Sequence, residues 1–343
     1  MKRSPAVKFG VIGLGMAAAP HARSLLDLAD RIETVAAFSP TPARRQEFAR
    51  SYGLPVTGDV ETIFADASID AVLLLTPPNT HLDLVRRAAD AGKHILLEKP
   101  LETSLARSRQ LVEVAETADV KLGVVLQHRF RPVCEALRAM MTSGRLGELV
   151  SASARLYNWR PQSYYDQPGR GTKARDGGGV LLTQGIHTLD LMISVAGLPV
   201  EAVGYATTSP VHHMETEDIA MGAMRFANGA LGGIAATTAA FPGFPDAVDV
   251  IGTKGTARLD GSSLVARFTD GSEATLTDDS AGGGAGADPM AFSHAHHRAL
   301  IADFADAIAA DAAPRVTGRE ALKVHRLIDA LLLSAESRIP RQV

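Results

Sequence analysis

The 343-residue chain has one cysteine, Cys134, few aromatic residues (5%) and a net charge of only −3. A single cysteine excludes an internal disulfide and a metal site built from cysteines, so a reducing cytoplasm is the expected compartment. The slightly negative charge disfavours nucleic acid and anionic membranes as partners. No apolar run reaches the ~18 residues that a membrane-spanning helix needs. The sequence therefore predicts a globular cytoplasmic protein, long enough for two domains.

The N-terminus imitates a signal peptide, with basic residues at Lys2 and Arg3 and small residues at 17–19. Lys8 and several glycines interrupt the apolar block between them. The same residues fit a strand, a turn and a helix better, which disfavours secretion.

The stretch after this basic start predicts a dinucleotide-binding unit. Val7–Ile12 is an apolar strand, Gly13-x-Gly15-x-x-Ala18 follows, and an alanine- and leucine-rich helix continues to Ala29. Gly13 allows the tight turn, Gly15 lets a pyrophosphate approach the backbone, and Ala18 keeps the helix close to the strand. The free N–H groups of the helix then face a diphosphate. The alternative is a plain tight turn.

The residue after the second predicted strand, Glu33–Phe38, bears on the choice of cofactor. NAD-binding sheets usually carry Asp or Glu here, about 20 residues past the glycine turn, to hold the adenosine ribose. This chain has Ser39 there, with Arg44 close behind. A hydroxyl and a guanidinium suit a 2′-phosphate, which favours NADP. NAD is the alternative, with Arg44 then a solvated helix residue.

Strands and helices alternate with short connections as far as Leu126, which predicts a doubly wound parallel sheet. Ligands of such sheets bind at the carboxyl ends of the strands. We therefore expect the cofactor to be bound along this edge, by Gly13, Gly15, Met16, Ser39, Arg44, Thr76, Pro77, Asn79, His81, Glu98, Lys99 and Gln127.

From Glu148 the pattern changes to strands joined by hairpin turns, of which Asn228-Gly229 is the strongest signal. This predicts a mainly antiparallel sheet with one face on a helix and a broad open face. We expect a dinucleotide-binding domain over residues 1–130 and a substrate-binding and oligomerisation domain over 131–343, with a homodimer or homotetramer formed through the open face. The C-terminal helices, 295–309 and 321–337, are free to pack back on the first domain.

Two stretches predict catalytic chemistry. Lys99 lies at a strand's carboxyl end, where an ammonium can stabilise charge on a substrate oxygen. A single helix over Val180–Ala196 carries the polar stripe Thr183, His187, Asp190 and Ser194, in which Asp190 would orient His187 as a general base. The alternatives are a surface lysine paired with Glu98, and polar core residues that satisfy each other. Substrate contacts are expected from Thr183, Arg129, Trp159 and Arg160.

No metal site is expected. His294, His296 and His297 begin a helix and have no partner at zinc-like spacing beyond themselves. We likewise expect no metal at His212-His213. The glycine- and alanine-rich segment Asp278–Pro289 predicts a mobile loop.

The sequence resembles the Gfo/Idh/MocA oxidoreductases, the glucose-fructose oxidoreductase and inositol dehydrogenase group, over nearly its whole length. The resemblance rests on the glycine turn, on Thr76-Pro-Pro-Asn-Thr-His81, on Glu98-Lys99-Pro100, and on Gly177-Gly-Gly-Val-Leu-Leu-Thr-Gln-Gly-Ile-His-Thr-Leu-Asp190. It implies an α/β protein with a Rossmann domain and an α+β domain carrying a large open-faced sheet. It also implies that Lys99 contacts nicotinamide and substrate, that His187 is the acid/base, and that Asp190 supports the site.

Two residues depart from the family pattern. Thr183 and Ser39 stand where many members have acidic residues, which leaves the polyol and the cofactor open. We expect an NAD(P)-dependent dehydrogenase acting on a secondary alcohol of a sugar, inositol or similar polyol. The alternatives are a dinucleotide-binding regulator without catalysis and a redox-assisted glycoside hydrolase.

Overall fold

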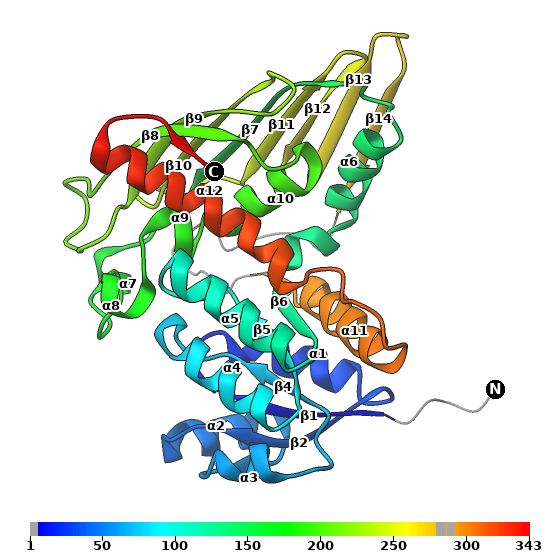
Figure 1. Cartoon of the computed structure of the whole chain (residues 1–343), viewed down its shortest axis with the longest axis vertical. Helices are drawn as coiled ribbons and strands as arrows, with labels where there is room; N and C mark the ends of the chain where they lie inside the picture. The colour runs from blue at the N-terminus through cyan, green and yellow to red at the C-terminus, as the bar shows by residue number, and fades with distance from the viewer. Residues whose placement is uncertain (1–5, 279–285, 287–291) are drawn as a thin grey trace. The chain divides into compact units, whose positions relative to one another are not determined.

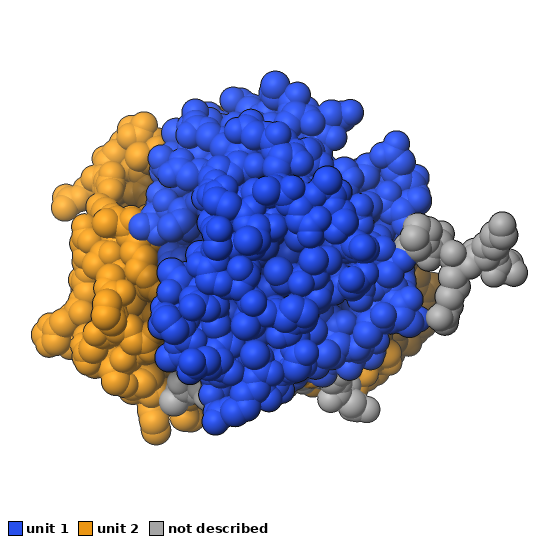
Figure 2. Space-filling view, turned by 90° about the horizontal axis from the view of Figure 1, so that it is seen from below, with its two compact units in different colours: residues 1–125, 294–322 blue, residues 126–293, 323–343 orange. Residues whose placement is uncertain are grey.

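The computed structural model describes residues 6–278, 286 and 292–343. It divides into two compact units, each discontinuous in sequence (Figure 2). Unit 1 comprises Met1–Val125 and His294–Leu322, and unit 2 comprises Leu126–Ser293 and Lys323–Val343. The basic start of the chain and most of the expected Asp278–Pro289 loop lie outside the described residues.

Unit 1 is built on a six-stranded sheet in the order β3-β2-β1-β4-β5-β6, with every neighbouring pair parallel. This is the doubly wound order of dinucleotide-binding folds, as the alternation of strands and helices predicted. The strands are β1 Val7–Ile12, β2 Ile32–Phe38, β3 Val56–Thr57, β4 Ala71–Leu74, β5 His94–Glu98 and β6 Leu122–Val125.

Helices cover both faces of this sheet (Figure 1). Alternate residues of β1 point to opposite faces, so the Phe9 ring packs edge-on against Phe304 at 6.2 Å while Gly10 leaves room for Ile63. The helices of unit 1 are α1 Ala18–Asp27, α2 Pro42–Tyr52, α3 Glu61–Ala65, the short 3₁₀ turn η1 Pro78–Thr80, α4 His81–Asp90, α5 Leu105–Thr117 and α11 Ala295–Ala309. Helix α11, from the C-terminal part of the sequence, packs beside α1.

Unit 2 is built on a nine-stranded sheet in the order β14-β13-β12-β11-β7-β10-β9-β8-β15. Its pairs are antiparallel except β7 with β10, which run parallel. The predicted Asn228-Gly229 turn joins β9 to β10, with Gly229 at φ 87°. The strands are β7 Leu149–Tyr157, β8 Glu201–Thr207, β9 Ile219–Arg225, β10 Leu231–Thr237, β11 Ala247–Gly252, β12 Gly255–Asp260, β13 Ser263–Phe268, β14 Glu273–Thr277 and β15 Arg341–Gln342.

One face of the nine-stranded sheet is covered by helices α6, α10 and α12 (Figure 1). A Cβ on Gly204 or Gly222 would meet the Leu331 side chain at 3.3 or 2.6 Å, so these glycines let α12 lie close to the sheet. The helices here are η2 Gln127–Phe130 (3₁₀), α6 Pro132–Thr142, α7 Gln162–Tyr165, α8 Lys173–Asp176, α9 Val180–Thr183, α10 Ile186–Ala196 and α12 Gly318–Ser337, which begins in unit 1 and continues into unit 2.

The prediction of a single helix over Val180–Ala196 is wrong, because this segment forms two separate helices, α9 and α10. The Val180 carbonyl accepts hydrogen bonds from the N–H groups of both Gln184 and Gly185, at 3.2 and 2.7 Å. The bond from Gly185 spans five residues instead of the four of an α-helix, which widens the turn and ends α9. Thr183 therefore belongs to a different helix from His187.

Among the described residues, no single helix is long and apolar enough to cross a bilayer. The bent pair Lys173–Thr183 and Ile186–Ala196 meets the criteria of length and composition only when taken together.

Candidate functional site

The carboxyl ends of the parallel strands in unit 1 bring several predicted residues to one edge. Gly13 follows β1, Ser39 follows β2, and Lys99 follows β5. Because neighbouring strands are parallel, these residues share the edge at which sheets of this type bind ligands.

The turn after β1 fits a dinucleotide. Gly13 has φ +107°, and a Cβ there would lie 2.8 Å from the Leu75 backbone, so only glycine makes this turn. A Cβ on Gly15 would meet nothing within 4 Å, which leaves open space beside the backbone. In the described chain, no side chain caps the start of α1 and its first turn has no acidic residue. The free N–H groups there suit a phosphate, and Met16 beside them is 44% exposed.

The end of β2 differs from the expectation in detail. Ser39 is only 1% exposed, and its hydroxyl lies 3.3 Å from the Thr41 N–H that it accepts. Arg45 turns back and donates to the Ser39 carbonyl at 2.6 Å, whereas Arg44 is exposed. No carboxylate stands at position 39 to hold the adenosine ribose.

The residues after β4 that are predicted to contact the cofactor differ in exposure. Pro77 and Asn79 are exposed, and Thr76 is partly exposed and accepts a hydrogen bond from the Thr80 hydroxyl at 2.7 Å. His81 is fully buried, which corrects its expected contact with the cofactor. Its Nε2 lies 2.8 Å from the Thr76 carbonyl, and its Nδ1 lies 3.0 and 3.1 Å from the carbonyls of Pro100 and Leu101.

His81 therefore joins the ends of β4 and β5. Burial lowers its pKa, although the three carbonyls favour the charged ring. Glu98 is likewise buried, and its Oε2 accepts the Lys99 N–H at 3.0 Å while Oε1 bonds His21. Both residues position the segment that carries Lys99, whose side chain is partly exposed.

In unit 2, the segment after β6 brings His128 against His187 of α10. The rings of His128 and His187 stack with centroids 4.9 Å apart and planes 30° apart. Just before them, the side-chain carbonyl of Gln127 is buried without a hydrogen-bond partner among the described residues. A buried orphan acceptor of this kind calls for a ligand or a water.

Asp190 is paired with Arg129. Both its carboxylate oxygens accept hydrogen bonds from Arg129, from Nε at 2.8 Å and Nη2 at 2.7 Å, and both side chains are buried. Arg129 thus holds the carboxylate of Asp190 in place. Sequence spacing could not reveal this, since the two residues are 61 positions apart.

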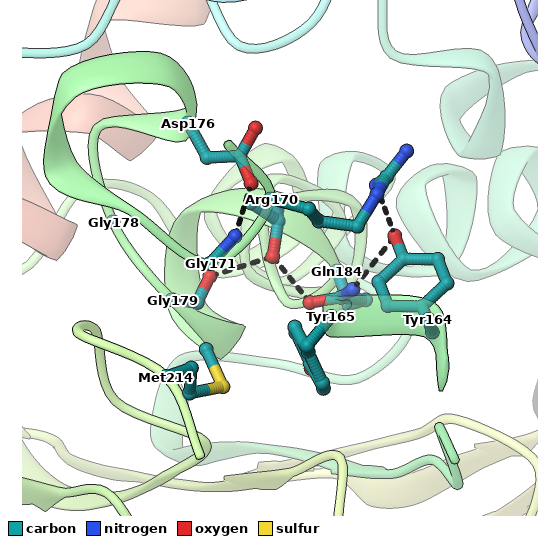
Figure 3. Close-up of a pocket in the computed structure, with 10 residues that line it drawn as sticks. Tyr164, Tyr165, Arg170, Gly171, Asp176, Gly178, Gly179, Gln184 and Met214 are labelled. Atoms are coloured by element: carbon teal, nitrogen blue, oxygen red, sulfur yellow. Dashed lines mark hydrogen bonds between the residues drawn. The ribbon is translucent and has the colours of Figure 1, made fainter. Parts of the chain in front are cut away.

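Thr183 lines a small recess together with Tyr164, Arg170, Gln184 and Met214 (Figure 3). The Arg170 guanidinium donates to the Tyr164 hydroxyl at 2.6 Å and lies over its ring at 4.3 Å. The Thr183 hydroxyl donates to the Gly179 carbonyl at 2.7 Å. Arg170 thus places a cation at the wall of the recess.

Glu217 is a structural residue that the sequence analysis missed. Its carboxylate accepts hydrogen bonds from the N–H groups of Gly179 and Leu181, at 2.9 and 3.2 Å, and so caps α9. A Cβ on Gly179 would lie 1.8 Å from the Glu217 carbonyl, which explains the last glycine of the Gly177-Gly-Gly run. Burial raises the pKa of Glu217 despite these bonds. No local pattern marks this contact.

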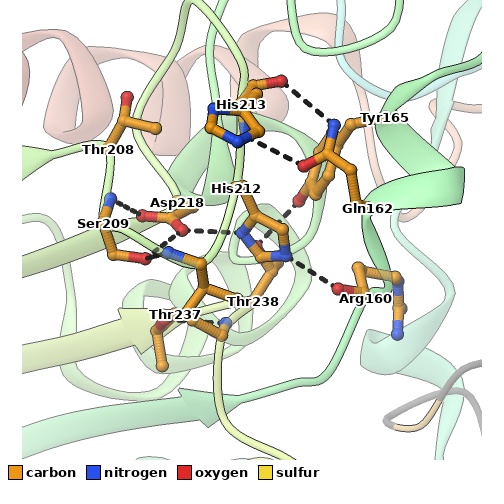
Figure 4. Close-up of polar contacts among 12 residues, drawn as sticks. Arg160, Gln162, Tyr165, Thr208, Ser209, His212, His213, Asp218, Thr237 and Thr238 are labelled. Carbon is orange, nitrogen blue, oxygen red and sulfur yellow. Dashed lines mark hydrogen bonds and ion pairs between the residues drawn. The ribbon is translucent and has the colours of Figure 1, made fainter.

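Arg160, expected at the substrate, lies in a buried polar cluster (Figure 4). Trp159, also expected there, lies beside His212 of this cluster, with ring centroids 6.2 Å apart. Arg160 is 3% exposed and donates to the carbonyls of Trp159 and Gly286, at 2.8 and 2.5 Å. The Arg160 carbonyl accepts from Nε2 of His212, whose Nδ1 lies 2.7 Å from Asp218. Arg160 is therefore structural, and Trp159 packs edge-on against Phe241.

The histidines at the start of α11 have a partner set that their spacing does not indicate. Among the described residues, His297 lies with His21 of α1 and Glu98 of β5, and one potential ligand atom from each lies within 4.8 Å of the other two. The partners of His297 come from distant parts of the sequence, so spacing along the chain could not indicate them. His294 instead lies 2.9 Å from Asp27.

Comparison with known proteins agrees with this geometry. Residues 7–126 match the oxidoreductase family with an NAD-binding Rossmann fold, and residues 134–258 match the GFO/IDH/MocA C-terminal domain. Myo-inositol 2-dehydrogenase of Thermotoga maritima is 30% identical over 257 residues, covering 73% of this chain and 74% of the relative. Inositol 2-dehydrogenase of Rhizobium meliloti is 34% identical over 187 residues, but the match spans only about half of each protein, 54% and 53%.

Solved structures extend the similarity to the whole chain. The WlbA dehydrogenase of Bordetella pertussis, in complex with NADH and UDP-GlcNAcA, aligns with a TM-score of 0.85 at 25% identity over 99% of both chains. The matches in sequence and in fold lead to one assignment: the chain belongs to the Gfo/Idh/MocA family of oxidoreductases.

Proposed function

We propose that the protein is an NAD(P)-dependent dehydrogenase that interconverts a secondary alcohol of a sugar, inositol or related polyol with its ketone. The observation that carries the proposal is Lys99, which follows β5 at the ligand-binding edge and whose backbone N–H is held by Glu98. Relatives named inositol dehydrogenases support the class of substrate.

Each of the candidate site residues would have its own role in the hydride transfer. The nicotinamide, when bound, supplies the hydride acceptor or donor. Lys99 donates a hydrogen bond to the substrate oxygen and stabilises the negative charge that develops on it. His187 takes the hydroxyl proton, since an imidazole ordinarily titrates near neutrality. The stack with His128 holds the plane of the His187 ring, and Asp190, itself held by Arg129, orients the imidazole.

For the cofactor, we propose that NADP is preferred over NAD. Position 39 offers no carboxylate to bind the ribose hydroxyls or to repel a 2′-phosphate, and the exposed Arg44 lies nearby in sequence. The open space beside Gly15 and the uncapped start of α1 suit the diphosphate of either cofactor.

We also propose that the uncovered face of the nine-stranded sheet joins copies of the chain in a dimer or tetramer. Register places Tyr205 opposite Met221, and Leu231 and Ile251 both opposite Ser151, so these apolar side chains share one face. Tyr205, Leu231 and Met221 are 77, 62 and 50% exposed in the single chain. Light scattering should give more than one chain per particle, and Met221→Lys with Leu231→Lys should reduce that number.

Purified protein mixed with NADP⁺ or NAD⁺ and a panel of polyols tests the activity, with cofactor reduction followed optically. Lys99→Met and His187→Asn should each lower turnover at least ~100-fold, whereas His213→Asn, at an exposed histidine, should not. Full turnover in the first two variants would refute the assigned roles. Cofactor binding without any turnover would favour a regulator, and glycoside cleavage without net cofactor reduction would favour a redox-assisted hydrolase.

A further inference from the structure

Three side chains in unit 1 form a buried cluster that the proposed dehydrogenase chemistry does not use. His21 comes from α1, Glu98 from the end of β5 and His297 from the first turn of α11. Their exposed fractions are 1, 9 and 3%, and one potential ligand atom from each lies within 4.8 Å of the other two. Two imidazoles and a carboxylate are thus gathered out of water by three separate elements.

The contacts within the cluster leave capacity for another ligand. His21 Nε2 lies 2.8 Å from Glu98 Oε1, and the His21 and His297 rings meet edge-on at 5.0 Å. With Nε2 bonded to Glu98, the other ring nitrogen of His21 is buried without a hydrogen-bond partner in the described chain. A buried polar nitrogen in this state is unfavourable, and native structures normally satisfy it with a water or an ion.

We propose that His21, Glu98 and His297 bind one Zn²⁺ ion. Two histidines and one glutamate are a known three-residue zinc set, with the fourth position left to water. Bonds of about 2.1 Å in a tetrahedron place the ligand atoms about 3.4 Å apart, and one potential ligand atom of each residue lies within 4.8 Å of the other two. Imidazole ligands favour zinc over magnesium or calcium, which prefer oxygen.

The second oxygen of Glu98 supplies the outer support that such sites require. It accepts the Lys99 N–H at 3.0 Å, which fixes the carboxylate's orientation. A bound ion would fasten α11 to α1 and β5, all within unit 1, and would stabilise that unit. The ion is assigned no part in the hydride transfer.

The test uses the full chain without an affinity tag, first dialysed against a chelator. Equilibrium dialysis with Zn²⁺ should give one ion per chain, and Co²⁺ should give the visible absorption of a tetrahedral site. Zinc at about 100 times its Kd should raise Tm by about 5 °C.

His297→Phe keeps an aromatic ring beside His21 while removing a ligand, and should weaken zinc binding at least tenfold and abolish the Tm shift. Glu98→Gln should do the same. His296→Phe, at the buried neighbour on the same helix, is the matched control and should bind as the wild type does. The Tm of each variant without metal reports whether it folds. Absence of stoichiometric zinc in the wild type, or undiminished binding in a folded His297→Phe, would overturn the proposal in favour of a water or adventitious binding.

Discussion

The guanidinium of Arg129 holds the carboxylate of Asp190 through two hydrogen bonds, at 2.8 and 2.7 Å, and water reaches neither group freely, since they are 7% and 0% exposed. One residue lies in η2 and the other in α10, so the pair ties the chain after β6 to the helix that carries His187. The pair thereby fixes Asp190 in place on the helix of the candidate base.

Removing one partner of this pair should be costly. Arg129→Met leaves a buried carboxylate uncompensated and should lower the free energy of unfolding by about 3–5 kcal/mol in urea denaturation. Arg129→Met combined with Asp190→Leu should cost less than the sum of the single changes. The control is Arg258→Met, which breaks an exposed pair with Asp249 and should cost under about 1 kcal/mol. Equal losses for Arg129→Met and Arg258→Met would contradict this account.

The titration of Asp246 should make the free energy of unfolding fall as pH rises. It is half-buried and accepts a hydrogen bond from the Thr188 hydroxyl at 2.5 Å, and desolvation of its carboxylate raises its pKa to about 6 from the ordinary 3.8. Between these values the folded chain holds a proton that the unfolded chain has lost. The stabilisation is therefore complete below pH 3.8 and is lost as pH rises through 6, by about 3 kcal/mol in all.

Asp246→Asn removes this titration. Its free energy of unfolding, relative to the wild type, should rise by about that amount between pH 4 and pH 7. Urea denaturation of both proteins at several pH values measures the difference. Parallel stability curves would show that Asp246 is ionised equally in the folded and unfolded chains.

The thiol of Cys134 should be inert in the folded protein. Burial raises its pKa to about 12 from the ordinary 9, so the thiolate that reacts is about 1,000-fold scarcer. A thiol reagent should react at least ~100-fold more slowly with the native chain than with the urea-unfolded chain. Because the sequence has one cysteine, the whole signal reports this residue. Rapid native reaction would mean that α6 opens readily.

Local sequence patterns predicted much of the fold. The strand, glycine turn and helix from Val7 onward follow from residue chemistry that acts over a few positions, as does the Asn228-Gly229 hairpin. The start of α12 is likewise a local feature, because the Thr317 hydroxyl accepts the Glu320 N–H at 3.2 Å, as in a capping box. Each signal is complete within four or five residues of chain.

The contacts that shape the candidate sites could not be predicted in this way. Glu217 caps α9 from 38 positions away, and His297 meets Glu98 across most of the sequence. Such pairs depend on how distant elements pack, which no local periodicity encodes. The break before α10 could not be predicted from the sequence for a related reason. Leu182 and Ile186 keep a helical spacing across the break, and both are buried.

The end of β2 should decide between the two cofactors. Ser39→Asp places a carboxylate where the adenosine ribose is expected, which should raise NAD binding and repel the 2′-phosphate of NADP. We expect the ratio of kcat/KM for NADP⁺ to that for NAD⁺ to fall at least ~10-fold, which corresponds to about 1.4 kcal/mol. Arg44→Gln should lower the same ratio by raising KM for NADP⁺ while leaving NAD⁺ little changed, because only NADP carries the charge that Arg44 would meet. Arg50→Gln, at an exposed arginine of the same helix that pairs with Glu47, is the control and should leave the ratio unaltered. If Ser39→Asp and Arg44→Gln both left the ratio unchanged, the end of β2 would not be where this protein reads the 2′ position, and the preference for NADP would lose its basis.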